Sequence, residues 1–450
     1  MRTETAAVVH PRTPRVGVSW PSITIILLYL FSLHAYLPVP IPGNAIPFGV
    51  AIVIAAGIFL VDNQKWPTQV VRLLVAISAI ASIGIVTGPS ARAFLGQRVV
   101  TTGFFAASLF AAIVIYQEMK MWPATTMRRL FGCISIVLIV GALFEVFTPV
   151  KQISDAFRSA VALKGVLYTA DLRDLMDTGI IRPKFFSLEP SILASGVGLT
   201  ALLWLMLAYD DRWRMVKFAA LIVGGFAIIR SPTVLVYFPA GIFVAYLSAQ
   251  PGEARGINYT RRMLIVVGLG VLCLPLIYVL AEQLMAERLQ KILAGRDAST
   301  LVRLLLPPLL TWRVLTDNPL FGIGLGGKNA IIHETLGTVM GLRLNPSYLI
   351  ETGGIEGVFP IPAIEYWATF GLLGGTIILV FLRRLLRLLT SHDAVAILFS
   401  ILCMSLAGGY VGGTYFWSAC ALLVVTSHVR WRDTQRITNA PSRPELMYDK

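Results

Sequence analysis

Charged residues are scarce in this 450-residue chain: Asp, Glu, Lys and Arg together make up 14% of it, against 56% hydrophobic residues. Soluble globular proteins carry about 25% charged residues, so the composition argues against a soluble enzyme. Apolar stretches of roughly 18 residues or more recur between Ser19 and Val429, and each is long enough to cross a ~30 Å hydrocarbon core. We therefore expect an all-α polytopic membrane protein.

Cysteine is rare and metal-binding spacings are absent. The four cysteines (Cys133, Cys273, Cys403 and Cys420) are far apart and lie in apolar stretches, which makes a disulfide framework or a zinc site unexpected. We interpret them as small buried hydrophobic residues. There is no haem or Walker-type spacing, and no DxD cluster for a divalent metal at a sugar nucleotide. We expect neither metal nor cofactor, so any chemistry must use arginines, carboxylates and one histidine.

The positive charge surplus, +14 at pH 7, is not gathered in a compact basic domain, so nucleic acid is not an expected partner. Basic clusters such as RRL (128–130) and RRLLR (383–387) instead alternate with uncharged turns such as LPVPIPGN (37–44) and GGYVGG (408–413). By the positive-inside rule this alternation predicts twelve transmembrane helices with both termini cytoplasmic. The expected spans are about 20–37, 46–61, 68–87, 99–117, 130–148, 190–209, 215–229, 232–248, 262–283, 363–382, 394–410 and 412–429.

Two extracytoplasmic segments are longer than a turn. In the first, apolar residues recur at roughly helical spacing (Ile153, Phe157, Val161, Leu167, Leu172 and Leu175), which predicts an amphipathic helix on the membrane surface. The second is a large loop containing short helices. The expected organisation is a cytoplasmic tail, not a cleaved signal, with helices 1–5 (1–148), a first loop (149–189), helices 6–9 (190–283), the large loop (284–362), helices 10–12 (363–429) and a cytoplasmic tail (430–450).

The stretch RPKFFSLEPS places Arg182, Lys184 and Glu189 immediately before an apolar run. Pro190 suits the first position of a helix, so Glu189 would take the cap position, where the helix dipole stabilises a carboxylate. One interpretation is a capping Glu189 with Arg182 as its salt-bridge partner. The other is the rim of an active site, with cationic donors beside a carboxylate that acts as a base.

A second basic turn, IIRSPT (228–233), has Arg230 as its only charge, followed by Ser231 and Pro232 as expected cap and first helical residue. A lone arginine beside a helix N-terminus can form an anion site, because the guanidinium and the free N–H groups point the same way. The alternative is an arginine that merely reaches for the membrane interface. Arg98 is a weaker candidate of the same kind.

The large loop supplies further candidates. Residues 295–327 predict a helix kinked at Pro307-Pro308 and carrying Arg303 and Arg313, followed by the glycine-rich turn NPLFGIGLGG. No strand–helix unit surrounds these glycines, so a nucleotide fold is not supported.

Two titratable residues complete the candidates. His333 is the one histidine expected in an outer loop, where it could act as a base or simply be structural. Glu365 lies in the first turn of the tenth expected span, where a carboxylate is costly unless it has a role.

In their order and outer placement, the R-x-x-x-F-x-x-EPS, RSPT and R…W…NPLFGIGLGG patterns resemble the superfamily of Wzy-type polysaccharide polymerases and O-antigen ligases, over about residues 180–375. The resemblance implies glycosyl transfer at the outer face of the bacterial inner membrane, from a polyprenyl-pyrophosphate-linked oligosaccharide. It implies membrane lipid, a chain-length regulator and a flippase of the same pathway as further partners. It also implies that Arg182 and Arg230, with Arg303 or Arg313, hold the pyrophosphate, and that Glu189 or His333 is the base.

One segment departs from the family pattern. Polymerases of this superfamily often have His-Asn before the helix after the large loop, and ligases have a histidine within that loop. Here the pre-helix segment reads FPIPAIEYW, and His333 lies some thirty residues upstream. The distance of His333 from that position weakens the case for a ligase more than the case for a polymerase. A polymerase is the leading hypothesis, and a ligase that moves glycan onto a lipid acceptor is the near alternative. A lipid-linked oligosaccharide transporter is less favoured, because charges lie at the outer rim and not at the membrane centre.

Overall fold

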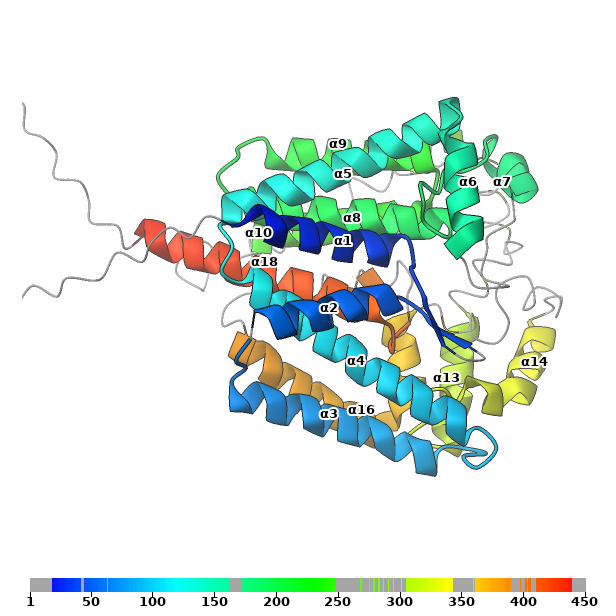
Figure 1. The fold of residues 1–450 in the computed structure, drawn as a ribbon. Coiled ribbons are helices and arrows are strands. Elements are labelled where there is room, and N and C mark those ends of the chain that lie inside the picture. Colours follow the sequence, from blue (N-terminus) through cyan, green and yellow to red (C-terminus); the bar gives the residue numbers. More distant parts are fainter. Residues whose placement is uncertain are drawn as a thin grey trace, which may run out of the picture.

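The computed structural model describes residues 18–41, 44–62, 64–161, 171–247, 305–342, 361–389 and 410–438, together with residue 359 and single positions within 268–301 and 397–405. Most long helices lie side by side with their axes roughly aligned, and shorter helices gather at one end of this bundle (Figure 1). The helices are α1 (Trp20–His34), α2 (Gly49–Val61), α3 (Thr68–Thr87), α4 (Leu95–Met119), α5 (Ala124–Phe147), α6 (Val150–Val161), α7 (Asp171–Thr178), α8 (Pro190–Leu207), α9 (Arg214–Ile229), η1 (Pro232–Val236), α10 (Tyr237–Leu247), α13 (Leu306–Asp317), η2 (Lys328–Ile331), α14 (Ile332–Gly341), α16 (Pro362–Leu389) and α18 (Thr414–Thr438).

The all-α membrane fold expected from the sequence is confirmed, apart from one small hairpin. Strands β1 (Val39–Ile41) and β2 (Asn44–Ile46) pair antiparallel, with Val39 opposite Ile46, in the uncharged turn between α1 and α2. Helices α3, α4, α5 and α8 are long and apolar enough to cross a membrane, and α1, α2 and Pro232–Ala245 are shorter apolar helices. The expected spans 262–283 and 394–410 lie largely outside the described residues, so the described part does not reach twelve spans.

Helix boundaries follow local chemistry more closely than hydropathy. Helix α3 has the expected bounds, whereas α5 begins before its expected start at 130, directly after Pro123. Helix α18 continues to Thr438, beyond the expected end at 429. Hydropathy marks the apolar part of a helix, but the backbone hydrogen bonds continue into polar sequence until a proline or a cap ends them.

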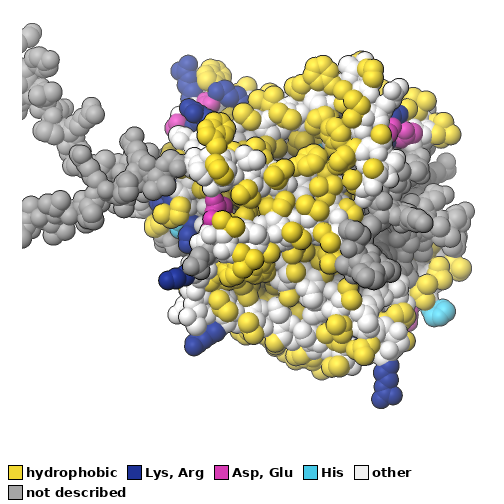
Figure 2. All heavy atoms as spheres, in the orientation of Figure 1, with side chains coloured by type: hydrophobic (Ala, Val, Ile, Leu, Met, Phe, Trp, Pro, Cys, Tyr) yellow, Lys and Arg dark blue, Asp and Glu magenta, His cyan; other side chains and the backbone are white. Residues whose placement is uncertain are grey.

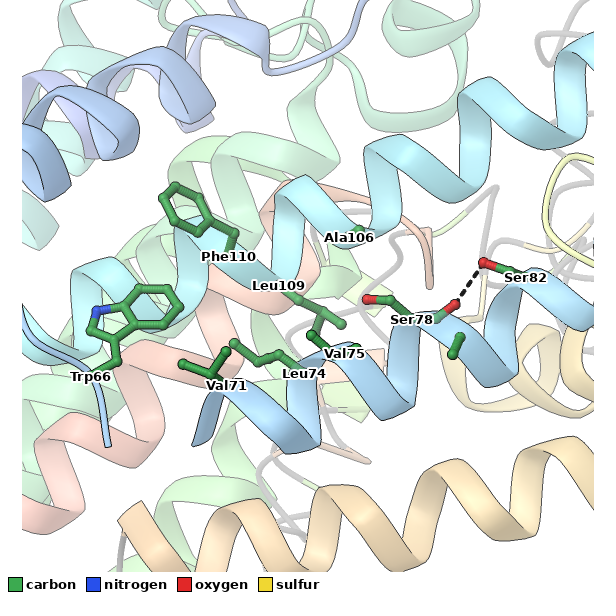
Figure 3. Close-up of a pocket in the computed structure, with 10 residues that line it drawn as sticks. Trp66, Val71, Leu74, Val75, Ser78, Ser82, Ala106, Leu109 and Phe110 are labelled. Atoms are coloured by element: carbon green, nitrogen blue, oxygen red, sulfur yellow. Dashed lines mark hydrogen bonds between the residues drawn. The ribbon is translucent and has the colours of Figure 1, made fainter. Parts of the chain in front are cut away.

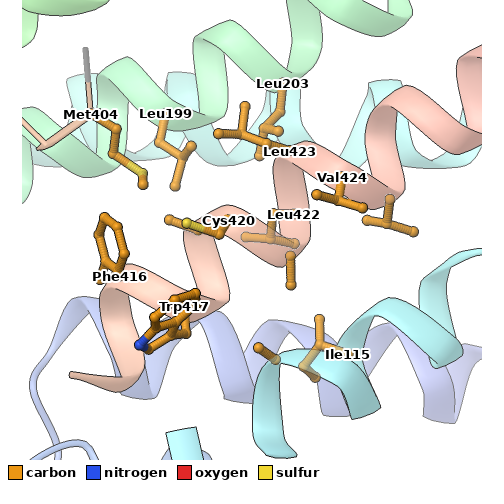
Figure 4. Close-up of a cluster of buried hydrophobic side chains, with 14 of the residues drawn as sticks. Ile115, Leu199, Leu203, Met404, Phe416, Trp417, Cys420, Leu422, Leu423 and Val424 are labelled. Carbon is orange, nitrogen blue, oxygen red and sulfur yellow. The ribbon is translucent and has the colours of Figure 1, made fainter. Parts of the chain in front are cut away.

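The core of the bundle forms where α18 packs against α4 and α8. Figure 4 shows Trp417, Cys420 and Leu423 of α18 among side chains from these neighbours, including Ile115 and Leu199. Cys420 is buried as expected, but Cys133 on α5 is exposed, which corrects the expectation that the cysteines are buried. Its outward position reflects the helical register of α5, which hydropathy alone does not give.

Hydroxyl groups join helices within this core. The Tyr29 hydroxyl lies 2.5 Å from Ser418 Oγ, and Ser135 Oγ donates to Thr200 Oγ1 at 2.8 Å. Interhelical hydrogen bonds of this kind contribute about 0.6 kcal/mol each in membranes, so they specify which helix faces match more than they stabilise.

Charge is distributed as a membrane requires. Figure 2 shows hydrophobic side chains across the middle of the visible face, with Lys, Arg, Asp and Glu gathered toward its two ends. At the end opposite the short helices, Arg128 pairs with the exposed Asp210, and Arg432 donates to the carbonyl oxygens of Lys120 and Trp122 at 2.5 Å each. Which side of the membrane this end faces stays a prediction.

A break in α16 is the main irregularity of the bundle. Gly371 has φ 66° and ψ −176°, which interrupts the helix between two helical halves. The glycine-rich turn 318–327 fills the break: Ile323 N and Gly324 N each donate at 2.9 Å, to Ala368 O and Thr369 O, while Leu372 N donates to Pro319 O at 2.8 Å. The glycines of this turn therefore allow backbone to pack on backbone.

Arg98 fastens the same turn to the other helices. Its Nη1 donates to Gly84 O and Ile323 O, and its Nη2 to Pro89 O, each at 2.6 Å. Gly324 has φ +74°, and a Cβ there would lie 2.5 Å from Gly84 O. Arg98 is fully buried and supports the wall of the bundle, so this geometry gives no support to its predicted role in binding an outer anion.

The expected kink at Pro307-Pro308 stays a prediction, because residues 302–304 lie outside the described residues. Leu301 is helical, and helix α13 begins at Leu306 with both prolines in its first turn. Proline costs no hydrogen bond there because the first N–H groups of a helix have no intrahelical acceptor. The pair is therefore well placed to begin α13.

Arg98→Ala should destabilise the bundle strongly. Three carbonyl oxygens would lose this donor, two of them in buried hydrogen bonds, at about 1–3 kcal/mol for each buried group left unsatisfied. We expect a drop of several degrees in the melting temperature of the detergent-purified protein, and almost none for the exposed Arg92→Ala. Equal melting temperatures for the two variants would contradict this role of Arg98.

Candidate functional site

The candidate site lies at the end of the bundle where α5 ends and α8 begins. Helices α6 and α7 lie at this end, and α6 crosses the direction of the long helices (Figure 1). The predicted amphipathic segment therefore forms two helices. Its apolar residues Ile153, Leu172 and Leu175 are exposed, Phe157 packs against Phe31 and Phe186, and Leu167 lies outside the described residues.

Arg182 forms an ion pair with α7. Its Nε lies 2.8 Å and its Nη2 2.5 Å from Asp174 Oδ1, and both residues are buried. The predicted salt bridge between Arg182 and Glu189 is therefore wrong. Sequence proximity favoured Glu189, but the fold brings the carboxylate of α7 against the guanidinium.

Lys184 forms a second ion pair with the same helix. Its Nζ lies 2.6 Å from Asp171 Oδ1, although the lysine side chain is only 1% exposed. Lys151 of α6 approaches Asp171 Oδ2 to 3.2 Å. Burial raises the pKa of Asp171, but the hydrogen bonds and charges of Lys184 and Lys151 outweigh it and hold that pKa below its usual value.

Arg230 reaches the end of α7. Its backbone is left-handed, with φ 50° and ψ 39°, and terminates α9 directly before Ser231 and Pro232, which begin η1 as predicted. The guanidinium Nη1 donates to Thr178 O, at the negative end of the α7 dipole. We call Arg182, Lys184 and Arg230 the cation cluster, because α7 brings these three predicted residues together.

Glu145 of α5 holds the RPKFFS loop (residues 182–187), which carries Arg182 and Lys184, through backbone hydrogen bonds. Its carboxylate accepts hydrogen bonds from Lys184 N, at 3.1 Å, and from Phe185 N. Phe185 and Phe186 have φ 39° and 67°, a left-handed conformation that costs roughly 1–2 kcal/mol per residue. His34 Nε2 lies 2.8 Å from Phe185 O and fixes the loop from the side of α1.

Glu189 occupies the predicted N-cap position of α8, with Pro190 as the first helical residue. Its side chain does not cap the helix and accepts a hydrogen bond from Ser191 Oγ instead. Ser187 Oγ lies 2.6 Å from Lys184 O and 2.9 Å from Glu189 O, so one hydroxyl links the cation-bearing loop to the cap. Glu189 is half-buried.

The predicted residues of the large loop lie elsewhere. Arg313 on α13 and His333 on α14 are both exposed, and these helices lie at the same end of the bundle as α7 but apart from it (Figure 1). Among the described residues no contact joins them to the cation cluster, and Arg303 lies outside the described residues. Their roles in pyrophosphate binding and in catalysis stay predictions.

Glu365 is fully buried in a structural ion pair. Its Oε1 lies 2.7 Å from Lys328 Nζ, and its Oε2 accepts from Val411 N at 2.8 Å. Lys328 also lies over the Tyr410 ring at 4.6 Å. These contacts join the glycine-rich turn, α16 and the start of α18. The presence of the Glu365 carboxylate in an apolar helix is therefore explained by its structural pairing.

An apolar groove of about 460 Å³ lies between α3 and α4. Figure 3 shows Trp66 and Phe110 toward one end of it, and Ser78 and Ser82 joined by a hydrogen bond. No ionisable side chain lines the groove, so it cannot perform acid–base or charge-stabilising chemistry. In the described part of the chain, no three His, Cys, Asp or Glu side chains gather as a metal site needs.

Sequence reasoning missed the acidic side of the site. Asp171, Asp174 and Glu145 were not among the candidates, and His34 was counted as part of a membrane span. The i, i+3 spacing of Asp171 and Asp174 shows that they share a helix face, but only the fold reveals which cations that face meets.

Glu145→Leu should destabilise the RPKFFS loop, because the backbone N–H groups of Lys184 and Phe185 would lose their hydrogen-bond acceptor. Each unsatisfied N–H group lowers the stability by about 1–3 kcal/mol. Glu145→Gln keeps an acceptor oxygen and should cost much less. We expect this order in melting temperature, with the exposed Asp210→Asn near wild type. A Leu variant as stable as the Gln variant would contradict it.

Comparisons of the chain with protein-family models, with curated protein sequences and with solved structures give no match. The function is therefore inferred from the arrangement of the site itself.

Proposed function

We propose that this protein is a polymerase that joins polyprenyl-pyrophosphate-linked oligosaccharide repeats into a polysaccharide at the outer face of a bacterial inner membrane. The observation that carries the proposal is the cation cluster. Arg182, Lys184 and Arg230 come from two separate segments and meet at one short helix, and the loop that carries Arg182 and Lys184 leads directly to Glu189 at the start of α8.

The donor explains why cations would gather at that end. Its pyrophosphate leaves as an anion, and a bundle end places that group level with lipid headgroups while the polyprenyl chain stays in hydrocarbon. Arginine and lysine donors are strong partners for phosphate oxygens. Preorganised donors of this kind contribute about 2.7–4 kcal/mol each where charge develops in a transition state.

The reaction needs one base and one anion site. The acceptor hydroxyl oxygen attacks the anomeric carbon of the donor sugar, and the carbon–oxygen bond to the pyrophosphate breaks. The bonding electrons leave with polyprenyl pyrophosphate, whose charge the cation cluster stabilises. The hydroxyl proton passes to Glu189. General base catalysis of this kind contributes a factor of about 10²–10⁴ in rate. His333 is the second candidate for this proton.

The twelve-span topology belongs to this proposal. Both termini would be cytoplasmic, because Arg128, Arg212 and Arg432 lie at the end of the bundle opposite α7, and basic residues favour the cytoplasmic side. The cation cluster then faces the periplasm. A ligase with a lipid acceptor would use the same donor site, so the acceptor alone separates these two functions.

A transporter is less well supported. Transporters of lipid-linked substrates need a path through the membrane centre, commonly beside broken helices. The break of α16 at Gly371 is the one feature of that kind in the described part, and the turn 318–327 already fills it with backbone hydrogen bonds. The cation cluster lies at the α7 end of the bundle and not beside this break.

Arg230→Ala is the cleanest test of the anion site. The Arg230 guanidinium donates to a backbone carbonyl, that of Thr178, so removing the side chain leaves no buried carboxylate without a partner. We expect chain extension to fall about 10²–10³-fold in liposomes supplied with the lipid-linked oligosaccharide. Arg212→Ala, at the opposite end, should extend chains normally. Normal extension by the Arg230 variant would remove it from the pyrophosphate site.

Glu189→Gln separates a base from a cap. Glutamine still accepts the hydrogen bond of Ser191, so melting temperature should not change. Extension should fall about 10²–10⁴-fold if the carboxylate takes the proton. An unchanged rate, together with a large loss in His333→Ala, would transfer the role of base to His333.

A further inference from the structure

Helix α7 meets every member of the cation cluster with an oxygen atom. Arg182 donates to Asp174 Oδ1, Lys184 to Asp171 Oδ1 and Arg230 to Thr178 O. We call these three acceptors the α7 oxygens. Because positions 171, 174 and 178 are spaced i, i+3 and i+7, they belong to one face of the helix. The cations that the proposed function assigns to the donor are thus already matched by an internal set of negative groups.

The binding of α7 depends mainly on these charges. The helix has only eight residues, too few for a helix that is stable by itself. Its apolar side chains contribute little burial, since Leu172 is 70%, Leu175 48% and Met176 58% exposed. An anion that competes for Arg182, Lys184 and Arg230 would therefore remove most of what holds α7 in place.

The structure also supplies a turn at which α7 can separate from the rest of the chain. Gly179 follows the helix with φ +72°, and a Cβ there would lie 3.5 Å from Arg230 Nη1. Beyond it, Glu145 and His34 hold the RPKFFS loop through Lys184 N, Phe185 N and Phe185 O, independently of α7. The loop can thus keep its cations in place when the helix moves.

We propose that α7 is an internal anion that occupies the cation cluster in the absence of substrate and is displaced by the pyrophosphate group of the donor. The α7 oxygens mark where the phosphate oxygens bind. The pyrophosphate group of the donor, esterified at both ends, carries two negative charges on adjacent phosphorus centres, and its oxygens accept charge-assisted hydrogen bonds from all three cations. This inference rests on the proposed function only for the identity of the anion.

The first experiment measures amide hydrogen exchange of the full-length, detergent-purified protein with inorganic pyrophosphate as the probe. We expect exchange in residues 172–178 to speed up at least tenfold at saturating pyrophosphate. Sodium chloride at matched ionic strength should leave it unchanged, and so should pyrophosphate for the distant helix α18. If calorimetry shows that pyrophosphate binds while α7 exchange stays the same or slows, or that it does not bind, the inference is overturned.

The second experiment removes the internal competitor. In the double variant Asp171→Asn, Asp174→Asn the pyrophosphate dissociation constant should fall about tenfold or more, equivalent to 1.4 kcal/mol. Asp210→Asn, which removes one carboxylate at the other end of the bundle, is the matched control. An unchanged or weaker affinity in the double variant overturns the inference. If the double variant does not fold, the exchange measurement on the wild-type protein decides.

These measurements separate the inference from the proposed function. Pyrophosphate binding that releases α7, in a protein that makes no polymer, would support displacement and overturn the polymerase. A ladder of polymer products with unchanged α7 exchange would do the reverse.

Discussion

Backbone groups in hydrocarbon must find hydrogen-bond partners inside the protein, and this requirement shapes the whole bundle. The break of α16 at Gly371 would leave several N–H and C=O groups without intrahelical partners. The turn 318–327 supplies those partners, and Arg98 fastens the same turn to the end of α3. A loop far along the chain thus becomes part of the wall, and α3, α4 and α16 depend on it for their mutual positions.

The same need for internal partners applies to buried charges. Buried ionised groups are costly unless they are paired and hydrogen-bonded. The buried cations Arg182, Lys184 and Lys328 each have a carboxylate within 2.7 Å. The Lys328–Glu365 pair joins three segments inside the bundle. The Arg182–Asp174 pair of α7 is equally buried, whereas Asp171, the partner of Lys184, is 36% exposed.

The proposed displacement of α7 relates this pairing to an anionic substrate. A cation cluster left without counter-ions would repel itself and attract any anion present. In the proposed scheme the α7 carboxylates stabilise the empty state, so that a ligand has to exceed their stability in order to bind. The proposed cost is a reduced affinity for the substrate, in proportion to the stability of the internal pairs.

The sequence by itself determined the class of the protein, most helix positions and the identity of the rim residues. Apolar length, proline at helix starts and the placement of basic loops are local properties, so α3, α8 with Pro190, and the Arg230–Pro232 turn followed from them directly. The partners of those residues did not follow. Arg182 pairs with Asp174 and not with Glu189, Arg98 supports a wall, and the two prolines of α13 begin a helix. Only the tertiary structure decided these points, because electrostatic pairing and the filling of a broken helix depend on which distant segments the fold brings within about 3 Å, and sequence spacing carries no such distance.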